Sequence, residues 1–197
     1  MINITKAEST SDLDGIIRLI YETDDYIYPS MCNSDYELFE IIMKKLLFGD
    51  TIFSYKNIII ACENYKTIGL LLYIDKNSKL PETIENIIGV NKKQSTDFDN
   101  VMEEYFKPLL SKINDDYLYI NNLCVNIEKR RCGIAGKLIN HLLQTFTNKK
   151  IVLDCLEENT AAIEFYLKWG FKITDRFLGF AGNKQEPISC LKLEVIP

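Results

Sequence analysis

Residues 117–146 pass from a β-rich run through a basic turn with two glycines into an amphipathic helix. The run YLYINNLCVN predicts a strand, the turn EKRRCGIAGKL follows at once, and the stretch after it has a helical apolar pattern. The apolar positions on one helix face are Leu138, Ile139, Leu142, Leu143 and Phe146. A strand (151–156), a short helix (158–170) closed by Gly170, and two final strands (171–180 and 186–195) complete this half. This order predicts a mixed α/β sheet.

The N-terminal half predicts further strands and helices of the same domain. The expected elements are a strand at 2–7, a helix capped by Ser11 or Asp12, a helix at 34–48, and an antiparallel hairpin from strands 57–64 and 67–75. Residues 76–116 interrupt this rhythm with a polar, turn-rich half and a helix candidate at 97–113. Pro108 is expected to kink or break that helix. With no internal repeat or linker, we expect a single domain over 1–197, with an insertion at 76–116 between the third and fourth strands.

The composition excludes several classes of function. A net charge of -5 and a pI near 5.1 argue against a general nucleic-acid or anionic-membrane binder, and leave room for cationic substrates. The N-terminal segment has no apolar signal core, and no apolar run approaches the length of a membrane span. Six cysteines without a CxxC, and His141 as the single histidine, provide no zinc-ligand spacing. We therefore expect a cytoplasmic protein with reduced thiols and no metal.

The basic turn has the features of an anion site at a helix N-terminus. Backbone amides without internal partners meet the positive end of the helix dipole there. Gly133 and the small Ala135 let the backbone approach a bulky anion, and Arg130, Arg131 and Lys137 add charge. These features predict a phosphate or diphosphate cradle. An ordinary helix start with solvated basic residues remains open as the alternative.

Other phosphate and RNA motifs fit this turn less well. The tetrapeptide GIAG lacks the third glycine of GxGxxG. Leu138 follows Lys137 where a P-loop requires Ser or Thr, and Arg131 occupies the position of the first P-loop glycine. GIAG does match the GxxG loop of a KH RNA-binding module, but that loop joins two helices, and here a strand precedes it. The acidic composition also disfavours RNA as a partner.

Two sequence blocks together resemble the GNAT superfamily of acyl-CoA-dependent acyltransferases. The first signature, R/Q-x-x-G-x-G/A after a strand with L-x-V, is matched at 130–135 after Leu123-Cys124-Val125. The second, N-x-x-A-x-x-F-Y-x-x-x-G-F, is matched at Asn159, Ala162, Phe165, Tyr166, Gly170 and Phe171. The resemblance is close over 117–172, looser over 2–75 and 171–195, and does not reach 76–116. Ile127 stands where the family often has proline, which affects how the strand ends but not the cradle.

The resemblance implies a mainly antiparallel sheet of about seven strands, flanked by helices, whose fourth and fifth strands splay to admit acyl-CoA. It implies that the amides of 131–136 hold the diphosphate of acetyl-CoA, and that the pantetheine arm pairs with the open strand edge near Val125. A backbone N–H near Leu123–Val125 would polarise the thioester carbonyl. The implied cofactor-binding residues are Leu123, Cys124, Val125, Arg130, Arg131, Cys132, Gly133, Ile134, Ala135, Gly136, Lys137, Asn159 and Tyr166.

Some of these residues also have structural explanations. The resemblance implies that Tyr166 protonates the departing CoA thiolate, but its helical spacing also fits core packing. Asn159 would bind pantetheine or only cap its helix. Cys132 lies at a helix N-terminus, where a thiol pKa tends to fall, so a redox-sensitive thiol is the alternative to a tolerated small residue.

No motif identifies the general base or the acceptor. Glu157, at the end of one strand, and Asp116, just before another, are candidate bases. The segment 24–28 forms an acidic-aromatic cluster suited to a cationic amine, or a solvated loop. The resulting hypothesis is an N-acetyltransferase, monomer or homodimer, in which an amine attacks acetyl-CoA directly. The alternatives are a non-catalytic acyl-CoA-binding sensor module and a GxxG nucleic-acid binder.

Overall fold

The fold is built on one seven-stranded sheet with the order β1-β2-β3-β4-β5-β7-β6. The computed structural model describes residues 1–89, 92–179 and 187–197. The strands are β1 (Asn3–Lys6), β2 (Ile58–Glu63), β3 (Lys66–Ile74), β4 (Tyr117–Val125), β5 (Lys150–Leu156), β6 (Lys172–Gly179) and β7 (Ile188–Val195). All neighbouring strands are antiparallel except β4 and β5, which are parallel. The structure thus confirms the predicted mixed, mainly antiparallel sheet. Phe180 and Glu186, expected at the ends of the last two strands, lie outside the described residues.

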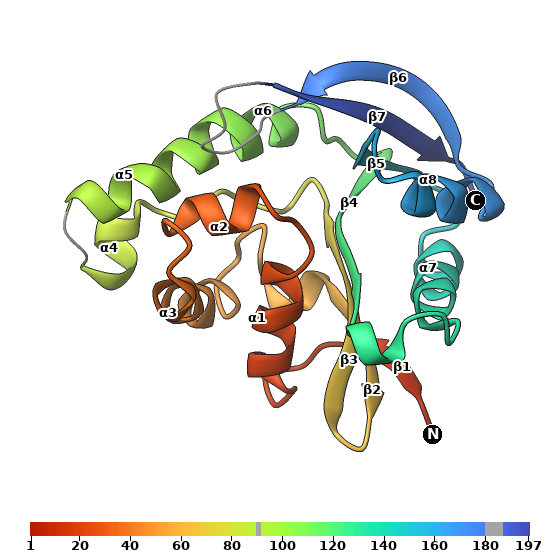
Figure 1. The fold of residues 1–197 in the computed structure, drawn as a ribbon, viewed down its shortest axis with the longest axis horizontal. Helices are drawn as coiled ribbons and strands as arrows, with labels where there is room; N and C mark the ends of the chain where they lie inside the picture. Colours follow the sequence, from red (N-terminus) through yellow and green to blue (C-terminus); the bar gives the residue numbers. More distant parts are fainter. Residues whose placement is uncertain (90–91, 180–186) are drawn as a thin grey trace.

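Helices cover both faces of the sheet and create two hydrophobic cores (Figure 1). On one side lie α1 (Leu13–Tyr21), α2 (Ile27–Met31), α3 (Tyr36–Leu46), α4 (Ile84–Ile88), α5 (Lys92–Val101), the π-helix η2 (Met102–Phe106) and α6 (Lys107–Leu110). On the other lie α7 (Ile134–Thr145) and α8 (Thr160–Lys168); short 3₁₀ turns are η1 (Tyr55–Asn57) and η3 (Ile127–Lys129). Within the described ranges, no helix is both long and apolar enough to cross a membrane.

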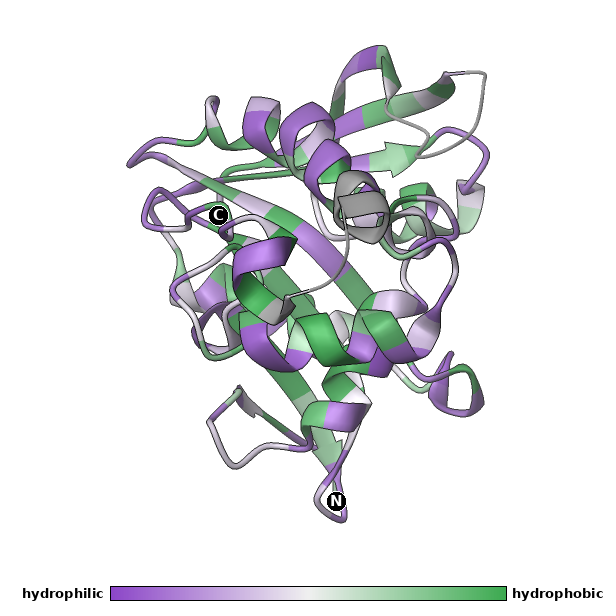
Figure 2. Ribbon diagram, turned by 90° about the vertical axis from the view of Figure 1, so that its left-hand side faces the viewer, coloured by the Kyte–Doolittle hydropathy of each residue, from purple (hydrophilic) through white to green (hydrophobic). Residues whose placement is uncertain are grey.

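The central strands β2 and β3 form the predicted hairpin and are buried on both faces. Figure 2 shows hydrophobic runs along the central strands, whereas the helices mix hydrophobic and hydrophilic residues. Alternate side chains serve different cores: Ile58 and Ile60 face the α1–α6 side, and Ile59 faces the α7–α8 side. The hairpin turn is two residues, Asn64 and Tyr65, both with positive φ, as a tight twisted turn requires.

The predicted helix caps are present in the structure. Asp12 caps α1, since its Oδ1 accepts from the Gly15 amide at 3.1 Å, and its Oδ2 accepts from the Thr67 amide of β3 at 2.8 Å. The same carboxylate therefore starts the helix and ties it to the sheet. At the other end of the chain, Gly170 closes α8 with a φ of 84°.

The segment between β3 and β4 is more continuously helical than Pro108 led us to expect. The helix passes from α5 through η2 into α6, and Pro108 lies in the first turn of α6. In the π-helix the Lys107 amide bonds to Met102, five residues back. This wider turn accommodates the proline, whose ring would clash in a regular α-helix. The buried residues Phe98, Val101, Met102 and Phe106 dock the segment onto the α1–α3 side.

Candidate active site

The two central strands β4 and β5 separate after a short parallel contact. They pair over only three positions, from Tyr117 opposite Lys150 to Tyr119 opposite Val152. Beyond these positions β4 continues to Val125 and stays paired with β3, while β5 continues to Leu156 and pairs with β7. The separation leaves one edge of β4 without a β5 partner, and an extended ligand can pair there.

A bulge in β4 lies next to the point of separation. Leu72 of β3 pairs with Asn122 and Tyr73 pairs with Ile120, so Asn121 is the extra residue. The Asn121 amide donates to the Tyr28 hydroxyl at 2.9 Å and to the Asn122 carbonyl oxygen at 2.8 Å. Tyr28 in turn donates to that Asn122 oxygen at 2.9 Å. These buried bonds attach the bulge to α2 and fix where β4 bends.

The turn before α7 has the geometry of an anion cradle. Gly133 is the N-cap residue with φ 75°, and Arg131 also has positive φ, 62°. Lys137 is the first residue of the helix whose amide bonds backward, to the Gly133 carbonyl at 3.1 Å. In the described chain, the amides of 131–136 have no recorded acceptor. The turn therefore offers six unpaired backbone donors beside the positive end of the helix.

Several residues of this turn make contacts within the protein itself. Arg130 donates from Nε to the Val125 carbonyl at 3.2 Å, and Lys129 pairs with Glu63 at 2.5 Å. Ile134 is buried in the α7–α8 core, so that residue offers only its amide to the cradle. Gly136 packs against Trp169, because a Cβ at this position would lie 2.9 Å from the indole. The exposed side chains left for a ligand are those of Arg131, Cys132 and Lys137.

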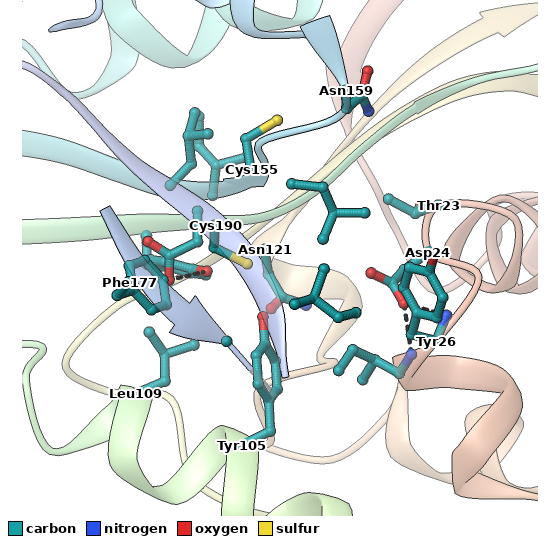
Figure 3. A pocket seen from close by; sticks show the side chains of 18 of the residues that line it. Thr23, Asp24, Tyr26, Tyr105, Leu109, Asn121, Cys155, Asn159, Phe177 and Cys190 are labelled. Atoms are coloured by element: carbon teal, nitrogen blue, oxygen red, sulfur yellow. Dashed lines mark hydrogen bonds between the residues drawn. The ribbon is translucent and has the colours of Figure 1, made fainter. Parts of the chain in front are cut away.

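A cleft of about 380 Å³ lies where β4 and β5 separate. Figure 3 shows side chains from several segments facing it, among them Tyr105 and Leu109 from η2–α6, Asp24 and Tyr26 from the α1–α2 connection, and Cys155 and Asn159 from β5–α8. Of the residues predicted from sequence, the cleft brings together Leu123, Asn159 and Tyr166. Cys124 is buried in the α1–α6 core and Val125 packs toward the α7–α8 core. The cleft therefore joins the free β4 edge to the start of α8.

Tyr166 packs in the α7–α8 core and also lines the cleft. Its ring contacts Phe165 and Phe171 edge-on, and the residue is 8% exposed. Burial, with a smaller contribution from Cys155, raises the pKa of its hydroxyl well above the ordinary value. Its hydroxyl makes no hydrogen bond within the described residues, so it is a protonated donor available to a ligand.

Asn159 and Glu157 have structural partners, whereas the side chain of Asp116 is exposed. Asn159 caps α8, since its Oδ1 accepts from the Ala162 amide at 3.1 Å, which leaves its amide group for a ligand. Glu157 accepts from Ser189 at 2.6 Å and pairs with Arg176, and it is not among the residues that line the cleft. Asp116 is exposed at the paired end of β4, also outside the lining.

Sequence reasoning missed Asp154 and Tyr105, which both line the cleft. Asp154 is the one charged residue within the apolar part of β5, and that isolated charge was the available signal. The acidic-aromatic cluster at 24–28 is divided by the fold. Asp24 lines the cleft and accepts from the amides of Tyr26 and Ile27, whereas Tyr28 is core. Burial raises the pKa of Asp24.

No metal-binding group of three His, Cys, Asp or Glu side chains occurs among the described residues. The cysteines of the cleft are poor nucleophiles, because burial raises the pKa of Cys155 to about 11 and also raises the pKa of Cys190. Both thiols are therefore protonated at neutral pH. The arrangement suits an anion at α7, an extended chain along β4, and chemistry at Tyr166.

Comparison with known proteins agrees with this geometry. A sequence model of the Acetyltransferase (GNAT) family matches residues 35–171, more than half of the chain. An N-acetyltransferase structure from Staphylococcus aureus Mu50 has a TM-score of 0.66 and 22% identity, covering 98% of this chain and 100% of its own. Arabidopsis thaliana Naa50, in complex with the bisubstrate analogue CoA-Ac-MVNAL, has a TM-score of 0.56 and 18% identity, covering 98% and 97%. At these identities the structures establish similarity of fold.

A shorter match joins the chain to a larger protein. Cysteine-rich protein 2-binding protein from Mus musculus is 42% identical over 62 residues, or 32% of this chain. The matched part spans only 8% of that relative's length. This similarity is therefore confined to a segment of the longer protein.

Proposed function

Because the chain belongs to the GNAT acetyltransferase family, we propose that it transfers an acetyl group from acetyl-CoA to a primary amine. The observation that carries this proposal is the continuity of three features. The unpaired amides of 131–136, the free edge of β4 and the cleft with Tyr166 follow one another in space. Together they match the diphosphate, the pantetheine arm and the thioester of one co-substrate.

The protein's own groups supply each step of the proposed reaction. The α7 amides bind the diphosphate, and Arg131 and Lys137 add charge at the rim. A backbone N–H near Leu123–Val125 polarises the thioester carbonyl toward the attacking amine. Tyr166 donates its proton to the departing thiolate. Because both cleft thiols are protonated at neutral pH, the amine attacks the thioester directly, without an acyl-cysteine intermediate.

The proposal is tested by binding and by turnover. Calorimetric titration of acetyl-CoA should give saturable binding, and no binding at millimolar ligand would exclude the cradle as a CoA site. A thiol-release assay with acetyl-CoA should then find an acceptor in a panel of 1,4-diaminobutane, L-lysine, kanamycin and the free-amine peptide MVNAL. If acetyl-CoA binds but none of the four panel amines causes thiol release, the enzymatic function is contradicted.

A further inference from the structure

The acidic side chain of Asp154 lies where two cavities meet. Asp154 lines the cleft described above and also a second cavity of about 450 Å³ between α6 and the β5–β7–β6 part of the sheet. Tyr119, Leu109 and Phe177 line both cavities as well. An acceptor can therefore reach Asp154 along a route separate from the β4 edge.

The two oxygens of this carboxylate have different surroundings. Oδ2 accepts a hydrogen bond from the Tyr119 hydroxyl at 3.2 Å, and Tyr119 is itself hydrogen-bonded to Tyr105. Oδ1 is buried and has no donor within the described residues. A buried carboxylate oxygen without a donor is costly, so the site lacks one N–H or O–H group. A protonated amine supplies that group.

We propose that Asp154 is the catalytic proton acceptor for the incoming amine, with Tyr119 and Tyr105 as positioning residues. The inference rests on the proposed acetyl transfer. The ammonium gives one proton to Oδ1 of Asp154, which passes it to solvent, and the neutral amine forms the C–N bond. The C–S bond then breaks as Tyr166 protonates sulfur. Tyr166 recovers its proton from the nitrogen, so the acceptor loses two protons in total.

The groups around Asp154 shift its pKa in opposite directions. Burial raises its pKa, while the Lys192 ammonium, the Tyr119 hydrogen bond and Lys112 lower it. The titratable and charged groups around it are Tyr119 on β4, Lys192 and Cys190 on β7, Asp175 on β6, Tyr105 on η2 and Lys112 after α6. A carboxylate with a raised pKa is a stronger base than an exposed one.

The test compares three variants on the panel amine that the wild type acetylates fastest. Asp154→Asn should lower kcat/KM by about 100-fold or more, with acetyl-CoA affinity unchanged by calorimetry. Asp154→Glu should recover most of the rate. Asp115→Asn is the control, since Asp115 is an exposed aspartate just before β4 and lines neither cavity. It should leave the rate within about threefold, because one altered surface charge moves rates little.

The pH profile distinguishes catalysis from a merely structural role. Without Asp154 the reaction needs amine that is already neutral, so the deficit of Asp154→Asn should shrink as pH rises toward the amine's pKa. A deficit that is constant with pH, or an equal loss in Asp115→Asn, would overturn the assignment. If the wild type turns over and Asp154→Asn keeps its rate, only this inference fails. If the wild type releases no thiol, the proposed function fails and the inference with it.

Discussion

Two substitutions of Gly133 distinguish its contribution to folding stability from its contribution to ligand affinity. Gly133 has φ 75°, and a Cβ built on it would meet nothing within 4 Å. Any L side chain there costs about 1–2 kcal/mol of backbone strain, but no clash with the protein. Gly133→Ala and Gly133→Leu should therefore lose similar stability. For a domain of this size, that loss corresponds to a fall in Tm of roughly 2–8 °C.

The two substitutions should differ in CoA affinity. The leucine side chain would project from Gly133 into open space, and Gly133 lies within the run of six unpaired amides at 131–136. If it displaces the diphosphate from two of them, the loss is about 1.5–3 kcal/mol for each charge-assisted hydrogen bond. A loss of about 3 kcal/mol raises Kd by roughly 100-fold. Alanine adds a single methyl group and should raise Kd by about tenfold or less, which is about 1.4 kcal/mol.

Calorimetry with acetyl-CoA and thermal melts measure these two quantities separately. S-acetylpantetheine, which lacks the diphosphate, provides the ligand control. Its kcat/KM should be nearly the same in wild type and Gly133→Leu. The reasoning is refuted if Gly133→Leu binds acetyl-CoA as tightly as Gly133→Ala does. If Gly133→Leu loses activity equally on both thioesters, the substitution distorts the cleft rather than blocking the diphosphate.

The remaining predictions concern four other positions. Tyr166→Phe should lower turnover by about 100-fold while leaving acetyl-CoA affinity and Tm near wild type; unchanged turnover would remove Tyr166 from the catalytic residues. Gly136→Ala should lower Tm, since overpacking against Trp169 costs about 1–3 kcal/mol and helix propensity returns about 1. Combining it with Trp169→Phe should restore part of the loss, and simple additivity would contradict the contact. Tyr28→Phe should lower the free energy of unfolding by about 1–3 kcal/mol, because buried partners at the β4 bulge lose two hydrogen bonds; an unchanged chemical-denaturation midpoint would show that they contribute nothing. The raised pKa of Asp154 means that the folded protein holds this proton more tightly than the unfolded chain, so stability falls as pH rises through that pKa. Asp154→Asn should thus raise Tm at pH 7, with the difference closing below about pH 4, and a lower Tm at pH 7 would contradict this.

Features that depend on neighbouring residues were predictable from the sequence. The α7 stripe buries Ile134, Leu138, Ile139 and Leu142, as a period of 3.6 residues requires. The β2–β3 hairpin and the cap of α1 follow from residues within a few positions of one another. The cradle is equally local, because unpaired amides belong to every helix start and glycine permits the positive φ. At Pro108, where the sequence predicts a kink or a break, a π-helical segment interrupts the α-helix just before the proline.

Features that depend on residues far apart in the chain were decided by the tertiary structure. Glu157 and Asp116 flank strands and Asp154 is an isolated charge within β5, but these local features do not show which carboxylate lines a cleft. The fold pairs Glu157 with Arg176 and leaves Asp116 exposed, while the splay of β4 from β5 opens the cleft beside Asp154. The sequence therefore determined the strands, the helices and the glycine turn with its unpaired amides, because these follow from periodicity and short-range hydrogen bonds. The tertiary structure alone decided which carboxylates line the cleft, because that depends on strand register, a bulge and distant packing.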